Sequence, residues 1–365
     1  MRHDPAFAPL LARRARGVNA IRLMVVDDSI TARTVYSRII EKERDLELTA
    51  VAGTAEEALA TLRTARVDVI LLDLEMPGMG GLEALPRMIA KARGAQVMVV
   101  SSLTLAGAEH TVQALALGAA DALPKPPPGG FDQAYRDGLV ARIRGIGRAR
   151  RVQRTAAPAP PPVVRRVATQ VPARILAIGA STGGIHALGR LFAGLPPRLA
   201  IPILVTQHLP CSFMEVFARQ LGDLSGREAV VARDRLVLAP DRIVIAPGDA
   251  HMTVVEWSGR HEIRLNRTPA ASGCCPSVDP LFASVAQVYG AHALGVVLSG
   301  MGRDGCLGAQ DIVAAGGTVL AQDEASCAVW GMPGAVAQAG LTAAVLPPEA
   351  LAGRIAGAAG GGRWN

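Results

Sequence analysis

Aromatic residues make up only 3% of this 365-residue chain, and it has no long uninterrupted apolar run. A membrane-spanning helix needs about 20 consecutive apolar residues, so the sequence predicts no stable membrane insertion. The apolar patch at residues 8–12 is also shorter than the core of a secretory signal, which takes roughly 7–15 residues. Hydrophobic residues nevertheless form 50% of the chain, so its cores are expected to consist mainly of Ala, Val, Leu and Ile. These features predict a soluble, cytoplasmic protein.

Cysteine is scarce, and its pattern argues against two common uses. The number of cysteines is odd, and all of them lie in the second half of the chain. The adjacent pair Cys274-Cys275 lacks the Cys-x-x-Cys spacing that zinc sites commonly show, and nothing in the sequence indicates secretion. We therefore expect reduced thiols and no cofactor in this half. The cysteines are Cys211, Cys274, Cys275, Cys306 and Cys327.

Acidic residues are absent from residues 141–174, which contain nine arginines. Removing these nine charges from the net charge of +7 leaves −2 for the rest of the chain, so the basic character belongs to one segment. We therefore expect no nucleic-acid partner. Such a segment is usually a solvated connector. The functional alternative is a basic patch that binds anionic lipid or an acidic partner.

Proline divides the chain into two domains. The run 155–162, Thr-Ala-Ala-Pro-Ala-Pro-Pro-Pro, favours extended polyproline II over packing and predicts a semi-rigid linker. A chain of this length is long enough for two domains that each bury a core. We expect a disordered extension over 1–20, a first domain over 21–144, an Arg- and Pro-rich linker over 145–172, a second domain over 173–350 and a flexible tail over 351–365.

Both domains are predicted to be doubly wound α/β folds. In the first, apolar strands alternate five times with amphipathic helices, which predicts a parallel (βα)5 sheet. The second repeats this alternation, but short β-rich runs at 242–246 and 252–256 are separated by a Pro-Gly-Asp turn. We expect an antiparallel hairpin there, inserted into a mainly parallel sheet. In the first domain we predict strands at 23–26, 47–52, 67–72, 96–100 and 120–123, and a helix at 135–146.

Three polar side chains follow apolar strands of the second domain. Ser181 lies in the turn Gly-Ala-Ser-Thr-Gly-Gly after one strand, His208 ends another, and Asp304 follows a third. The carboxyl ends of parallel strands meet at the edge where open α/β sheets place their sites. A serine hydroxyl becomes a nucleophile when a base takes its proton and donors stabilise the oxyanion that follows. The pattern therefore predicts a Ser-His-Asp triad.

Each of these signals alone has a plainer interpretation. The glycine-rich turn could cradle a phosphate or simply pack closely, a single histidine is more often structural, and an aspartate in a glycine-rich loop is more often a turn residue. The chain order Ser, His, Asp also differs from that of three known triad groups. A triad is recognised by geometry, however, so its order along the chain does not exclude it.

Polar residues also gather at the predicted strand ends of the first domain. Asp27 and Asp28 end the first strand, and Asp73 ends the third. Converging carboxylates repel one another unless a cation neutralises them, and hard oxygen ligands suit Mg²⁺. We expect these three residues to hold Mg²⁺ and Asp73 to accept a phosphoryl group. Ser101, which ends the fourth strand, and Lys125, which follows the fifth, would contact its oxygens.

The first half resembles response-regulator receiver domains. The run Val-Ile-Leu-Leu-Asp-Leu-Glu-Met-Pro-Gly around Asp73 carries the resemblance, with Asp-Asp-Ser at 27–29 and Leu-Pro-Lys-Pro at 123–126. It implies that a chemotaxis histidine kinase is the phosphodonor. Two positions depart from the family pattern. Gly80 replaces an aspartate in a turn, and Ala122 replaces the aromatic residue whose ring commonly swings inward on phosphorylation.

The whole chain resembles the CheB family of chemotaxis protein-glutamate methylesterases. Besides the three predicted triad segments, similar runs occur at 246–252, 276–279 and 326–333. The resemblance implies hydrolysis of γ-glutamyl methyl esters on methyl-accepting chemotaxis receptors, and deamidation of glutamines there. Cys274-Cys275 stands where the family commonly has a basic residue. This departure affects substrate docking near the loop and leaves the triad intact.

The resemblance also implies a role for each site residue. Ser181 would attack the ester carbonyl, His208 would carry its proton, and Asp304 would orient His208. The Met301 backbone N–H is the oxyanion-hole candidate, with Thr182, at the helix start, as its neighbour. The family further implies that the unphosphorylated receiver covers the Ser181 edge and that phosphorylation loosens this contact.

Three other function classes fit the sequence less well. A receiver-controlled binding module of a non-chemotaxis array, with a non-hydrolytic output domain, has no need of Ser181, His208 and Asp304 together. A nucleotide-dependent enzyme is disfavoured because the Gly-x-Gly-x-x-Gly fingerprint is absent. A DNA-binding output is disfavoured because no terminal helix-turn-helix or basic second domain is evident.

Overall fold

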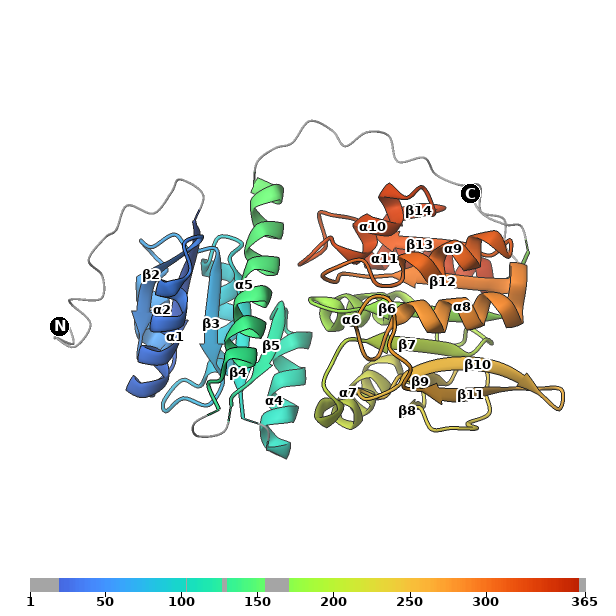
Figure 1. Cartoon of the computed structure of the whole chain (residues 1–365), viewed down its shortest axis with the longest axis horizontal. Helices are drawn as coiled ribbons and strands as arrows, with labels where there is room; N and C mark the ends of the chain where they lie inside the picture. The colour runs from blue at the N-terminus through green and yellow to red at the C-terminus, as the bar shows by residue number, and fades with distance from the viewer. Residues whose placement is uncertain (1–19, 103, 127–129, 155–170, 361–365) are drawn as a thin grey trace. The chain divides into compact units, whose positions relative to one another are not determined.

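The computed structural model describes residues 20–102, 104–126, 130–154 and 171–360 (Figure 1). These residues fall into two compact units that divide between Thr155 and Ala156. The predicted extension up to residue 19, the polyproline run and the end of the predicted tail lie outside the described residues. Within those ranges, no helix combines the length and the apolar character that crossing a bilayer requires.

The first unit contains the predicted five-stranded parallel sheet. Its elements are β1 (Ile21–Val26), α1 (Ile30–Lys42), β2 (Leu46–Ala52), α2 (Ala55–Thr61), β3 (Val69–Asp73), α3 (Gly81–Lys91), β4 (Gln96–Ser101), α4 (Leu105–Ala116), β5 (Asp121–Pro124) and α5 (Gln133–Arg154). The strand order is β2-β1-β3-β4-β5. All five residues of central β3 are buried, and alternate residues point to opposite faces, so both faces of the sheet are covered. This burial explains the continuous apolar run before Asp73.

Helix α5 is longer than predicted. The sequence indicated a helix over 135–146 and a linker from 145, whereas the helix continues to Arg154. Ile143 and Ile146 are buried on the apolar face, and the Arg144 guanidinium contacts Glu43 at 2.7 Å and Asp45 at 2.6 Å. Part of the arginine-rich segment is therefore a packed helix with paired charges, not a solvated connector.

The second unit is built on a seven-stranded parallel sheet. Its elements are β6 (Ile175–Ala180), α6 (Gly184–Gly194), β7 (Ile203–Gln207), α7 (Cys211–Ser225), β8 (Ala229–Val231), β9 (Ile243–Ile245), β10 (His251–Trp257), β11 (Arg260–Asn266), α8 (Val278–Tyr289), the 3₁₀ helix η1 (Gly290–His292), β12 (Ala293–Val297), α9 (Cys306–Ala314), β13 (Thr318–Gln322), α10 (Met332–Gln338), β14 (Ala344–Leu346) and α11 (Pro348–Ala359). The order is β14-β13-β12-β6-β7-β9-β8. Strands β6 and β12 are fully buried, as strands covered on both faces should be.

The predicted antiparallel hairpin is confirmed as β10 and β11, which form a separate two-stranded sheet. The run at 242–246, predicted to belong to this hairpin, lies instead in the parallel sheet. Its Ile243, Val244 and Ile245 are buried and pair with β7 as strand β9. A short run that is apolar at every position fits a strand covered on both faces better than a half-exposed hairpin.

The predicted flexible tail is helical for most of its length. Helix α11 continues to Ala359, with Leu351 and Ile355 fully buried. Its glycines lowered the helix signal in the sequence, but burial of the apolar face compensates. The start of the unit lies against this helix, because the Ala173 N–H donates to the Ala358 carbonyl at 2.9 Å.

Candidate functional sites

The three residues predicted as a triad lie at neighbouring strand ends of the second unit. Ser181 follows β6, His208 follows β7, and Asp304 lies in the loop after β12. Strand β7 lies on one side of β6 and β12 on the other, so the chain changes direction across the sheet at β6. Open α/β sheets bind ligands in the crevice at such a switch point.

The turn after β6 is tight and holds Ser181 half-buried at the sheet edge. The Ser181 N–H donates to the Ser299 carbonyl at 3.0 Å, and the Gly184 N–H donates to the Ser181 carbonyl at 2.7 Å. Gly183 has a φ of +76°, and a Cβ there would lie 2.5 Å from the Ala328 Cβ. Only glycine fits this position. The glycines after Ser181 thus let the strand pass directly into α6.

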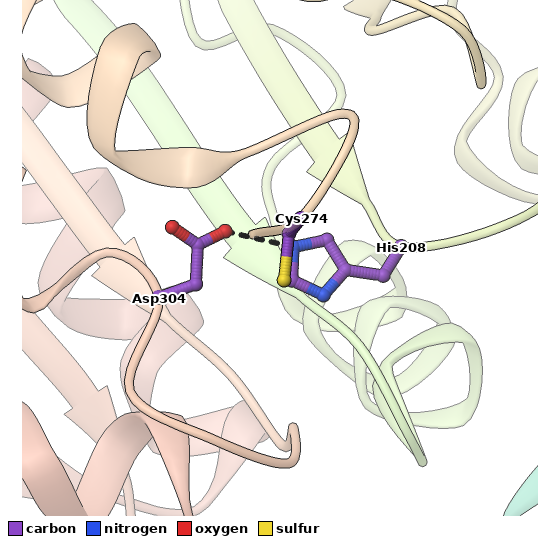
Figure 2. Close-up of side chains that lie close together, drawn as sticks. All are labelled: His208, Cys274 and Asp304. Carbon is purple, nitrogen blue, oxygen red and sulfur yellow. Dashed lines mark hydrogen bonds and ion pairs between the residues drawn. The ribbon is translucent and has the colours of Figure 1, made fainter. Parts of the chain in front are cut away.

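His208 and Asp304 form a hydrogen-bonded pair. Their Nε2 and Oδ2 atoms are 2.8 Å apart (Figure 2). Nε2 therefore carries the proton donated to the carboxylate, and Nδ1 is the ring nitrogen that remains to accept one. Within the described part of the chain, no hydrogen bond joins the Ser181 hydroxyl to His208. Catalytic hydrogen bonds are often long before substrate binds, so the Ser-His contact stays a prediction.

Asp304 is almost fully buried and surrounded by donors. Its Oδ1 accepts from the Ser277 hydroxyl at 2.7 Å and the Gly305 N–H at 3.0 Å, and its Oδ2 accepts from the Val278 N–H at 2.7 Å. Burial alone would raise the pKa of this carboxyl, but the bonds from His208, Ser277 and Val278 outweigh burial and hold the pKa well below its usual range. Asp304 is therefore ionised at neutral pH.

Cys274 lies beside the His208 ring (Figure 2). Burial would lower the pKa of His208, but interactions with Asp304 and Cys274 favour the protonated ring and raise the pKa to about 9. A sequence argument based on strand ends does not find Cys274, because it comes from the loop between β11 and α8.

Gln207 is a further residue that strand-end reasoning missed. Its buried side-chain amide donates to the Ser181 carbonyl at 3.0 Å and to the His208 carbonyl at 3.2 Å. One side chain therefore ties the serine turn to the histidine strand end. The only sequence signal was its place directly before His208.

His251 and Ser277 form a second group of supporting residues. The Nδ1 atom of His251 accepts from the Ser277 N–H at 2.9 Å, so Nε2 carries the proton and donates to the Thr268 carbonyl, also at 2.9 Å. His251 thus joins both ends of the segment 268–277 that carries Cys274. Both residues lie in the runs that resemble the family, but no pattern in the sequence predicts this contact.

The Gly-Met-Gly turn at 300–302 approaches the serine closely. A Cβ on Gly300 would lie 2.9 Å from the Ser181 Cβ. Among the described residues the Met301 N–H has no acceptor, which is the state expected of an oxyanion donor. Thr182 is buried, and its carbonyl accepts from the Ser299 hydroxyl at 2.8 Å. Both residues thus lie beside Ser181, and their role stays a prediction.

A cavity of about 360 Å³ opens next to Asp304. Its lining includes Cys274, Asp279, Met301, Arg303 and Leu307. Leu307 is 51% exposed and Met301 37%, both high for large apolar residues. The surface beside the candidate triad therefore offers apolar contacts together with a cationic group.

The first unit brings together the predicted carboxylates. Oxygen atoms of Asp27, Asp28 and Asp73 lie within 4.8 Å of one another, and the Lys125 Nζ lies 2.6 Å from the Asp73 Oδ2. Burial first, and the nearby Asp73 second, raise the pKa of Asp27 to about 6. Burial also raises the pKa of Asp73, although Lys125 opposes this.

This acidic group fits a hard divalent cation. The Oδ2 of Asp27 is buried and has no hydrogen-bond partner, whereas Oδ1 accepts from the Ser29 N–H at 2.9 Å. An orphaned carboxylate oxygen among converging carboxylates is what a Mg²⁺ ligand set requires. The buried side chain of Arg33, which the sequence analysis missed, donates to the carbonyls of Asp27 and Asp28 at 2.6 and 2.9 Å and fixes the loop.

Ser101 ends β4 as predicted, but its hydroxyl is engaged elsewhere. It forms a short hydrogen bond with the Thr111 hydroxyl, which itself donates to the Gly107 carbonyl at 2.6 Å. Contact between Ser101 and a phosphoryl oxygen therefore requires this hydroxyl to turn, and that contact stays a prediction. Ala122 is buried in β5, so no aromatic ring occupies its position.

Comparison with known proteins identifies similar proteins for both units. The family model described as response regulator receiver domain matches residues 23–131, and the one described as CheB methylesterase matches residues 176–355. Proteins named protein-glutamate methylesterase/protein-glutamine glutaminase are similar over nearly the whole chain. One from Paramagnetospirillum magneticum is 42% identical, covering 91% of this chain and 94% of the relative. One from Caulobacter vibrioides is 43% identical, covering 92% and 98%.

Proposed function

Because the chain belongs to the CheB methylesterase family, we propose that it hydrolyses γ-glutamyl methyl esters on methyl-accepting chemotaxis receptors and deamidates glutamines there. The observation that carries this proposal is the His208–Asp304 pair, placed beside Ser181 at the switch point of the sheet. The names of the relatives agree with both activities. We place the protein in the cytoplasm, where its substrate residues on receptors would be accessible.

Hydrolysis proceeds through an acyl-enzyme. The Ser181 oxygen attacks the ester carbonyl carbon while its proton passes to His208 Nδ1, the nitrogen not used by Asp304. The oxyanion is stabilised by the Met301 N–H. As the bond to the methoxy group breaks, His208 returns the proton and methanol leaves; with a glutamine, ammonia leaves instead. Water, activated by His208, then releases the glutamate from Ser181.

The network around Asp304 explains why this carboxylate serves as the anchor. Its five donors keep it ionised, so it stabilises the imidazolium that forms when His208 takes the serine proton. Gln207 holds the carbonyls of Ser181 and His208 at a fixed separation, so the nucleophile and base stay aligned.

Substrate specificity arises beyond the reacting group. A methyl ester offers little binding area, so affinity must come from the protein surface that surrounds it. The cavity beside Asp304 supplies exposed Met301 and Leu307 for the apolar face of a receptor helix, and Arg303 for its acidic side chains.

The first unit controls this activity. A histidine kinase transfers a phosphoryl group to Asp73, and Lys125 contacts one of its oxygens. Asp27, Asp28 and Asp73 would hold Mg²⁺, which would neutralise negative charge on the phosphoryl oxygens. Besides burial, the charge on Asp73 raises the pKa of Asp27, so a cation at this site would also relieve the repulsion between these two carboxylates.

The test is methanol release from methyl-labelled chemoreceptor membranes, with and without a small phosphodonor plus Mg²⁺. Release should depend on Ser181 and rise with phosphodonor in the wild type but not in Asp73→Ala. Ser181→Ala should lower the rate by several orders of magnitude, on the order of 10⁶-fold in a well-studied triad hydrolase. Retention of most activity by Ser181→Ala would disprove the assignment. No release from a folded chain that accepts phosphate would instead favour a non-hydrolytic binding module.

A further inference from the structure

A cysteine completes a group of three metal-ligating side chains around the candidate triad. Ligand atoms of His208, Cys274 and Asp304 all lie within 4.8 Å of one another, and Figure 2 shows the three side chains converging from three separate segments. Hydrolysis gives His208 and Asp304 a role, but it needs no thiol. The absence of a Cys-x-x-Cys motif does not argue against such a site, because its ligands are distant in sequence.

We propose that this group binds a thiophilic divalent cation such as Zn²⁺, and that the bound ion inhibits the hydrolase. Thiolate, imidazole and carboxylate are the ligands that zinc takes in proteins, at distances of about 2.0–2.3 Å. Neighbouring ligands of a tetrahedral ion are then about 3.5 Å apart. The His208–Asp304 distance of 2.8 Å would have to widen by less than about 1 Å.

The loop that carries Cys274 is already tied to this group. The Cys274 N–H donates to the Ser272 hydroxyl at 3.2 Å, and that hydroxyl donates to the Ser277 hydroxyl at 3.1 Å. Ser277 in turn donates to Asp304. The thiol is therefore held beside the pair by hydrogen bonds, so binding requires little reordering of the backbone.

An ion can reach the site from the side of the cysteine. The Asp304 side chain is only 2% exposed and that of His208 16%, whereas Cys274 is half-buried in an open loop and lines the adjacent cavity. Three protein ligands leave a fourth position for water.

Binding would exchange a proton for the metal and stop catalysis. The Cys274 thiol loses its proton to solvent as the sulfur–metal bond forms. His208 binds the ion through Nε2, so Nε2 gives up its proton and the neutral ring carries one on Nδ1 instead. Bonds to the ion then replace the His208–Asp304 hydrogen bond. His208 is then fixed by the metal and cannot serve as the base for Ser181. The three aspartates of the first unit offer only hard oxygen ligands, which suit Mg²⁺, so the two sites should prefer different ions.

The binding test uses the full chain with Co²⁺ as a spectroscopic probe, in the presence of excess Mg²⁺ to occupy the acidic site. Wild type should show a thiolate-to-cobalt charge-transfer band that Zn²⁺ abolishes. Cys275→Ser is the matched control, because this neighbouring thiol is outside the group, and it should keep the band. Cys274→Ser should lose it. A band of equal strength in Cys274→Ser would overturn the proposal, as would its absence from wild type.

The inhibition test rests on the proposed methylesterase activity, whereas the cobalt band does not. Zn²⁺ should inhibit methanol release by wild type and Cys275→Ser, and EDTA should restore it. For Cys274→Ser, measured against its own metal-free rate, the inhibiting concentration should rise at least 100-fold, since losing even an outer-shell partner of a metal ligand costs about 10–100-fold. Equal inhibition of Cys274→Ser would refute the assignment. A chain that shows the band but never hydrolyses esters would refute the function and leave the metal site standing.

Discussion

Replacing Ser277 with alanine tests the buried network that anchors the triad. Ser277 is fully buried, and its hydroxyl donates to the ionised Asp304 at 2.7 Å. A hydrogen bond to a charged group contributes about 1.5–3 kcal/mol, so Ser277→Ala should lower the free energy of unfolding by that amount at pH 7. All three tryptophans, Trp257, Trp330 and Trp364, follow residue 156, so their fluorescence during urea unfolding reports on the second unit alone.

The dependence of this loss on pH identifies its cause. The folded pKa of Asp304 is lowered, so its charge stabilises the fold above the unfolded pKa of about 3.9, and this stabilisation is lost as the pH falls through the folded pKa. The cost of Ser277→Ala should therefore be constant from pH 5 to 8 and shrink in acid. Ser299→Ala is the control: Ser299 is also buried, but its hydroxyl bonds the neutral backbone groups of Thr182 and Val329 rather than a carboxylate, so its cost should not follow this titration. A loss below about 0.5 kcal/mol for Ser277→Ala, the scale of an ordinary surface substitution, would refute the reasoning.

Three further predictions concern activity. Gln207→Leu removes the donor that joins the Ser181 and His208 carbonyls. In steady-state methanol release, kcat should therefore fall about tenfold, equivalent to about 1.4 kcal/mol, with KM little changed. A normal kcat would contradict this. The value of kcat/KM should rise with pH and level off at about pH 9, because only neutral His208 is a base. Cys274→Ser should shift this levelling-off to lower pH, because Cys274 favours the protonated ring. A wild-type profile that levels off below pH 7 would contradict the role of these contacts. A chain truncated to residues 171–365 should release methanol faster than the unphosphorylated whole chain, and an equal or slower rate would argue against control by occlusion.

The sequence was sufficient to locate the candidate residues because the sheet is parallel. A strand covered on both faces is apolar along its length, so the first polar residue after it, such as Ser181 or Asp73, marks the carboxyl edge. Within one parallel sheet, the carboxyl ends of all strands lie along the same edge. The sequence therefore predicts that His208 and Asp304 are neighbours although they are distant along the chain.

The supporting residues could not be predicted because their contacts depend on how a loop packs. Ser277 and Cys274 reach the triad because of the path of segment 268–277, whose two ends His251 joins, and no periodic pattern in the sequence indicates that path. The extent of α5 was missed for a related reason. Beyond residue 146 the helix contacts Asp45 through Arg148, at 3.5 Å, and a contact with a residue 103 positions earlier is not indicated by local composition.

The hydrogen bond between Ala173 and Ala358 brings the entry and exit of the second unit together. A folded unit with adjoining ends tolerates circular permutation, since a short peptide can close the old ends while new ones are opened in an exposed loop. It also tolerates insertion into a host protein, because it enters and leaves the host at a single point. The unit can therefore be joined to other sensory domains at its N-terminus, at its C-terminus or as an insertion, and it is suited to the construction of synthetic signalling proteins.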